Sequence, residues 1–129
     1  MKKISLIVVS LLLTMFAYSQ PTFHKIVKAT RCEYKNDKWV DVETKYVSDM
    51  FVIIDGFNIT VGTSKYRTYG DYEKSISDDH TTFTWKCVNS DGKSCYFMMK
   101  QFKPEVTTHW IYDFVYADES TMFEYECED

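Results

Sequence analysis

The sequence comprises 129 residues, of which 45% are hydrophobic and 17% aromatic, with only four Gly and two Pro. This composition excludes a collagen-like, low-complexity or intrinsically disordered chain, and the length suits one compact domain. The formal net charge is −4, from 15 basic and 19 acidic residues. Because nucleic-acid-binding domains usually carry a basic surface, this acidic balance argues against a nucleic-acid partner.

The N-terminal segment has the features of a secretory signal peptide. Two lysines precede an apolar stretch at residues 4–16, and Ala17 and Ser19 provide the small residues of a cleavage site. A membrane-spanning helix is the alternative, but the apolar stretch is only about 13 residues, against the roughly 20 that cross a bilayer. We therefore expect residues 1–19 to be removed. Residues 20–129 should then form a single secreted or periplasmic domain with no stable membrane insertion.

After this leader, hydrophobic and polar residues alternate nearly throughout, which is the period of β-strands. Turn residues divide the chain into nine expected strands. They cover residues 24–34, 39–46, 50–54, 57–61, 66–76, 81–88, 93–102, 107–116 and 121–127. No segment after the leader keeps an apolar i, i+3, i+4 pattern for three turns, so we expect little helix.

Tight turns between consecutive strands predict an antiparallel meander. Asp55-Gly56 lies between two β-branched runs and predicts a type I′ turn, in which both central residues have positive φ. Ser90-Asp91-Gly92 predicts a three-residue hairpin loop with Gly92 in the left-handed region. So many strands in so short a chain must curl to bury one face and limit open edges. The sequence therefore predicts an all-β fold, a small antiparallel β-barrel or barrel-like sandwich of about eight or nine strands.

Alternation within the strands places aromatic and sulfur-containing side chains on one face. The residues expected inside are Phe83, Trp85, Cys87, Cys95, Phe97, Met99, Trp110, Tyr112, Phe114, Tyr116, Phe123, Tyr125 and Cys127. Small barrels near eight strands either fill themselves with such side chains or hold one small ligand. These stripes are therefore expected to form the core, with the lining of a ligand cavity as the alternative.

The four cysteines indicate a disulfide-stapled domain. An even number in an exported chain of this size predicts two disulfides, and a zinc site would need CxxC pairs or matched Cys and His spacing, which are absent. The hairpin loop at residues 90–92 places Cys87 directly opposite Cys95, at a separation that a disulfide can span. By elimination, Cys32 is expected to pair with Cys127.

No motif for catalysis or cofactor binding is present. The chain has no GxSxG elbow, no GxGxxG, no GxxxxGK[ST] and no complete calcium loop. His24, His80 and His109 have no partner pattern for nucleophilic catalysis, and no carboxylate pair can be chosen from 19 acids. Asp78-Asp79-His80 could weakly bind a divalent metal, but a polar turn is the commoner explanation of these residues. We therefore assign no catalytic residue, no metal site and no cofactor.

Three tyrosines in one expected strand are the best candidates for a recognition surface. Tyr66 and Tyr72 should point to one side of the strand and Tyr69 to the other. Gly70 leaves a gap that a ligand or partner could fill, although a simple bend of the strand at this glycine is the alternative.

Three functional hypotheses follow. The first is an exported, non-enzymatic β-domain that binds a macromolecule, either a protein or a glycan, as an interaction or inhibitor module. The second is a carrier of a small apolar ligand with a cavity in the barrel, and the third is a hydrolase whose site the sequence does not reveal. An exposed aromatic patch favours the first, an internal pocket of about 300 Å³ the second, and clustered carboxylates or a perturbed His in a cleft the third.

Overall fold

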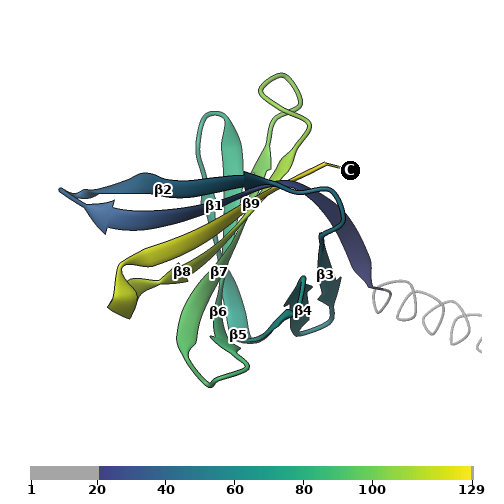
Figure 1. Cartoon of the computed structure of the whole chain (residues 1–129). Coiled ribbons are helices and arrows are strands. Elements are labelled where there is room, and N and C mark those ends of the chain that lie inside the picture. The colour runs from purple at the N-terminus through teal and green to yellow at the C-terminus, as the bar shows by residue number, and fades with distance from the viewer. Residues whose placement is uncertain (1–20, 129) are drawn as a thin grey trace, which may run out of the picture.

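The structure is a computed structural model that describes residues 21–128 (Figure 1). The expected signal peptide, residues 1–19, lies outside the described residues. Within them, no helix is long and apolar enough to cross a membrane.

Strands make up most of the described chain, and the predicted all-β fold is confirmed. In chain order the elements are β1 (Thr22–Lys35), β2 (Lys38–Tyr46), β3 (Phe51–Asp55), β4 (Asn58–Val61), β5 (Ser64–Ile76), β6 (His80–Asn89), β7 (Ser94–Phe102), β8 (Trp110–Tyr116), the short 3₁₀ turn η1 (Ala117–Glu119) and β9 (Thr121–Glu128).

The sheet closes on itself, which settles the choice between barrel and sandwich. From β3 to β9 each strand pairs with the next, and β9 pairs with β1. The long strand β1 pairs with β3 through its first residues and with β2 through its second half. Eight strands therefore form a closed antiparallel barrel, and β2 is an extra strand at its side (Figure 1).

The segment between β2 and β3 crosses the middle of β1. Val47 N donates to the carbonyl of Val27 at 3.2 Å, and Ile26 N donates to the carbonyl of Met50 at 2.8 Å. These bonds keep the backbone of β1 satisfied where its neighbour changes from β3 to β2.

Two of the hairpin loops show how glycine sets the turn type. Gly92 has a φ of 80° and closes the predicted three-residue loop between β6 and β7. The expected type I′ turn at Asp55-Gly56 is wrong, because Asp55 pairs with Asn58 and the loop residues are Gly56 and Phe57. Of these two only Gly56 has a positive φ, 60°, as in a type II′ turn, which tolerates an ordinary residue in the second position.

Aromatic rings fill the barrel. Tyr66 stacks on Phe114 with centroids 4.0 Å apart, and Phe97 lies between Trp85 at 5.5 Å and Tyr112 at 5.7 Å. Except for Phe83, every residue expected to face inward belongs to one core cluster or packs against it, together with Ile26, Val52 and Ile59. The buried members of this cluster are Ile26, Val52, Ile59, Val61, Tyr66, Cys87, Cys95, Phe97, Tyr112, Phe114, Tyr116 and Cys127. Burial of each large side chain stabilises the fold by roughly 1.5–3 kcal/mol.

The cysteines are unbonded in this structure, so a disulfide-stapled barrel is not supported. The predicted register of Cys87 opposite Cys95 is confirmed, and their Sγ atoms lie 2.7 Å apart.

The expected Cys32–Cys127 pairing is wrong for this arrangement of strands. Cys127 lies opposite Ile26 in the core, whereas Cys32 lies opposite Met122 near the other end of β9. Ile26, the partner of Cys127, and Cys32 are six residues apart along β1, which corresponds to about 20 Å, far beyond the Cα separation that a disulfide spans. Cys32 also faces the outside of the barrel, where its Sγ lies 3.4 Å from Asp41 Oδ1.

Candidate functional site

An exposed arm extends from the side of the barrel. We define the arm as residues 34–46, which comprise the end of β1, the turn at Asn36 and Asp37, and β2; its tip reaches beyond the neighbouring strands in Figure 1. Asn36 and Asp37 have φ values of 53° and 63°, so the turn brings β2 back tightly against β1. Because β2 pairs only with β1, its outer backbone edge faces solvent.

Aromatic and apolar side chains lie exposed on this arm. Tyr34 and Trp39 are cross-strand partners whose rings meet edge to face at 5.2 Å, with 46% and 37% of each residue exposed. Val42 and Tyr46 are also exposed along β2. Surface tyrosine and tryptophan residues supply large contact areas in protein interfaces, so the arm has the composition of a contact surface.

A hollow of about 320 Å³, which we call the mouth pocket, lies between the base of the arm and the barrel. Its lining residues are Ala29, Thr30, Arg31, Glu43, Lys45, Val47, Met50, Phe123 and Tyr125. The apolar members Val47, Met50, Phe123 and Tyr125 pack against the barrel core, so they form a fixed floor. This volume and this mixture of an apolar floor with a few polar groups are typical of a binding pocket.

The charges at the rim of the mouth pocket are already paired. Arg31 Nη1 lies 3.0 Å from Glu33 Oε1, and Lys45 Nζ lies 3.4 Å from Glu43 Oε1. An incoming charged group would have to compete with these ion pairs, whereas the floor offers contact area to an apolar group. The pocket therefore suits an uncharged apolar group.

The three candidate tyrosines do not form one surface. Tyr66 lies in the core, where burial raises the pKa of its hydroxyl above the ordinary range. Tyr69 is exposed on the outer face, and Tyr72 packs against Phe83 at 5.6 Å and Trp85 at 5.5 Å.

The bend considered as the alternative is present at Gly70. The pairing of β5 with β6 shifts between Tyr69 and Glu73, and Gly70 within this bulge has a φ of 73°. Glycine is the residue that adopts this conformation without strain.

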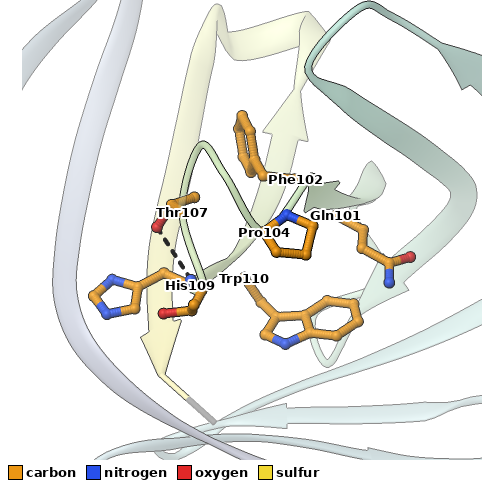
Figure 2. A pocket seen from close by; sticks show the side chains of 7 residues that line it. Gln101, Phe102, Pro104, Thr107, His109 and Trp110 are labelled. Carbon is orange, nitrogen blue, oxygen red and sulfur yellow. Dashed lines mark hydrogen bonds between the residues drawn. The ribbon is translucent and has the colours of Figure 1, made fainter.

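A smaller hollow of about 190 Å³ lies under the loop between β7 and β8. Figure 2 shows Pro104 and Trp110 facing each other across it, while the ring of His109 points away from Trp110. His109 N donates to Thr107 Oγ1 at 3.1 Å, and His109 Nδ1 lies 3.1 Å from Glu126 Oε1. The hydrogen bond to His109 holds the pKa of Glu126 below its usual range, and Lys28 adds to this effect.

A buried acidic pair lies on the outer side of β8 and β9. Asp113 is 0% exposed, its Oδ2 lies 3.0 Å from Lys100 Nζ, and its cross-strand neighbour is Glu124. Burial, followed by the effect of Asp113, raises the pKa of Glu124 to about 7, and Lys100 acts in the opposite direction. A protonated Glu124 can donate a hydrogen bond to the Asp113 carboxylate. Because Asp113 is closed to solvent, the pair forms part of the fold rather than an open catalytic site.

The histidines are spread over the barrel. His24 packs against Trp110 and Tyr112, while His80 Nδ1 lies 2.5 Å from Asp79 Oδ1. Over residues 21–128, no group of three or more His, Cys, Asp or Glu side chains is placed to hold a metal ion.

Comparison of the chain with protein-family models, with curated proteins and with solved structures gives no match. The functional argument therefore rests on the arm, the mouth pocket and the surface of the barrel. The mouth pocket could not be found from the sequence, because it depends on β2 and β3 both lying beside β1.

Proposed function

We propose that the protein is an exported, non-enzymatic binding module that recognises another protein through its arm and mouth pocket. The observation that carries this proposal is the apolar hollow of about 320 Å³ at the base of an exposed two-stranded arm. Export itself is proposed from the composition of residues 1–19.

The arrangement suits an extended segment of a partner lying along β2. The free edge of β2 offers unpaired backbone groups, and strand addition to such an edge is a common mode of peptide recognition. Val42 forms a β-bulge in β2 between Asp41, which pairs with Cys32, and Glu43, which pairs with Arg31. An added strand can therefore pair regularly with β2 only over short stretches on either side of Val42. Specificity then comes from one apolar side chain of the partner in the mouth pocket and from contacts with Tyr34 and Trp39.

The test begins by capturing partners from the exported fraction of the protein's own host, after which each captured protein is purified and its Kd measured directly. Trp39→Ser removes an aromatic contact of the arm, and Ala29→Leu partly fills the mouth pocket. We expect each variant to weaken binding at least about tenfold, the size of effect at interface hot spots.

Ile76→Ser is the matched control, because Ile76 is an exposed apolar residue on β5, outside the arm and the mouth pocket. This variant should bind as the wild type does. A partner that binds all three variants with unchanged Kd would contradict the proposal.

A carrier of a small apolar ligand is the second candidate, favoured by the same volume of the mouth pocket, which is at the lower end for ligand sites. Stacked rings occupy the barrel interior, so such a ligand would lie at the mouth. Native mass spectrometry of the exported protein separates the two functions. A co-purifying small molecule that is lost in Ala29→Leu supports the carrier, and an empty chain supports the binding module.

A further inference from the structure

A second surface, independent of the arm, runs across three neighbouring strands on the outside of the barrel. Tyr69 of β5, Lys86 of β6 and Tyr96 of β7 are consecutive cross-strand partners. Adjacent strands lie about 4.8 Å apart, so the two tyrosines flank Lys86 at a separation of roughly 10 Å. Their neighbours Cys87 and Cys95 point into the core, which places this row on the outer face.

The row lines a hollow of about 330 Å³, which we call the tyrosine hollow. Ser94, Ala117 and Asp118 complete its lining together with Cys95. Tyr69 is 47% exposed and Tyr96 is 43% exposed, so both rings offer apolar surface to a ligand. This is the place where one of the tyrosines singled out in the sequence meets a second exposed aromatic residue.

The polar groups of the tyrosine hollow are available for a ligand. Within residues 21–128, the side chains of Lys86, Ser94 and Asp118 form no hydrogen bond or ion pair. By contrast, Lys93 beside them is held by Glu119, with Nζ and Oε1 2.6 Å apart. The hollow therefore combines a free cation, a free hydroxyl and a free carboxylate with two exposed rings.

This combination selects the chemistry of the ligand. Lys86 and Asp118 carry opposite charges, so their fields offset each other and favour a neutral ligand over an ion of either sign. The ligand must also present apolar faces to the rings and several hydrogen-bonding groups to the polar side chains. Sugar rings have both features, since their C–H groups form apolar faces and their hydroxyl groups both donate and accept.

We propose that the tyrosine hollow binds a neutral saccharide. The rings of Tyr69 and Tyr96 stack on the C–H faces of sugar units. Asp118 accepts hydrogen bonds from hydroxyl groups, Lys86 donates to hydroxyl oxygens, and Ser94 does either. Hydrogen bonds to these charged groups are stronger than those between neutral partners, so they orient the ligand on the rings.

The experiment uses the exported protein and an array of immobilised neutral oligosaccharides of glucose, mannose, galactose and N-acetylglucosamine. Calorimetry in solution then gives the Kd of each oligosaccharide that binds. We expect Tyr69→Ala and Tyr96→Ala each to weaken binding at least about tenfold, because each removes one ring. Tyr96→Phe keeps the ring and should change the Kd less than about threefold.

Tyr46→Ala is the control for loss of an exposed tyrosine, since Tyr46 lies on the arm. This variant and Trp39→Ser should bind the saccharide as the wild type does, which separates this proposal from the one about the arm. The proposal is overturned if no oligosaccharide binds at millimolar concentration, or if binding survives loss of both Tyr69 and Tyr96. It is also overturned if these two variants abolish binding of a captured protein while no saccharide binds, which would make the hollow a protein interface.

Discussion

At the scale of single residues, Glu124 is a group whose protonation bears on the stability of the fold near neutral pH. It lies opposite the fully buried Asp113 and its pKa is raised to about 7, first by burial and then by Asp113. A carboxyl group whose pKa is higher in the folded than in the unfolded state binds an extra proton on folding, over the range between the two pKa values. Its favourable contribution is complete below pH 4.5 and is lost as the pH rises through 7.

We therefore predict that the free energy of unfolding falls between pH 5 and pH 8, by at most about 3 kcal/mol for this one group. Glu124→Gln should remove most of this slope, because the amide does not titrate. Denaturant unfolding at several pH values measures the effect. In the control Glu126→Gln the slope should persist, since the pKa of Glu126 is shifted downwards. An equal slope in wild type and Glu124→Gln would contradict the assignment.

The four cysteines separate into one pair and two isolated thiols. Cys87 and Cys95 lie in register with their Sγ atoms 2.7 Å apart, so we predict that they form a disulfide in an oxidising environment. Cys32 and Cys127 should stay reduced. Burial raises the pKa of both thiols to about 12, with Asp41 adding to the effect at Cys32, so neither forms the reactive thiolate readily.

Peptide mapping without reductant should give one linked peptide that contains Cys87 and Cys95. Because the closed loop is short, the bond should stabilise the fold by about 2–3 kcal/mol in the chain-entropy model. Free thiols at Cys87 and Cys95 in protein kept under oxidising conditions would contradict this prediction.

At the scale of elements, the loop that joins β4 to β5 is coupled to the mouth pocket. Gly62 has a φ of 58°, and a Cβ atom added there would lie 2.9 Å from Met50 Cε. Gly92 also has a positive φ, 80°, but a Cβ atom there would meet no other atom within 4 Å. Met50 lines the mouth pocket, so a substitution at Gly62 acts on both stability and the pocket.

We predict that Gly92→Ala costs roughly 1–2 kcal/mol through backbone strain alone. Gly62→Ala should cost only slightly more, because the flexible end of Met50 must also move but can do so at little cost. Chemical denaturation of the two variants, with binding of a captured partner measured in parallel, tests this difference. Equal stability of the two variants, with unchanged binding, would show that Met50 moves aside without cost.

Sequence alternation predicted the strands well because it reports which face of a strand is buried. It located nine strands, the inward stripe from Trp110 to Tyr116 and the register of Cys87 with Cys95. It failed where the result depends on strands that are distant in the chain. The elimination that joined Cys32 to Cys127 used no register between β1 and β9, and that register separates them.

The candidate sites were harder to predict for the same reason. Tyr69 was predicted only to point to the opposite side of its strand from Tyr66, and its neighbour on the outer face, Tyr96, lies two strands away. The mouth pocket requires β1 to change partners from β3 to β2, and no local pattern in β1 signals that change. Periodicity therefore identifies the faces of strands, whereas surface sites arise from pairings between them.

At the scale of the whole molecule, the barrel and the arm should differ in local stability. Strand β7 lies between β6 and β8, and its Phe97 is packed among the rings of the core. Strand β2 pairs only with β1, and of its residues only Val40 is partly buried. Opening of β2 exposes little additional apolar surface, so it should cost much less free energy than opening of β7.

Amide hydrogen exchange measures this difference directly. For the amides of β2 that donate to β1, we predict protection at least roughly 100-fold lower than for the amides of β7, which corresponds to about 3 kcal/mol. With such a difference, Trp39→Ser can abolish binding without unfolding the barrel. Equal protection of β2 and β7 would mean that the arm opens only when the barrel unfolds. A loss of binding in Trp39→Ser would then have to be accompanied by a loss of stability of the whole barrel.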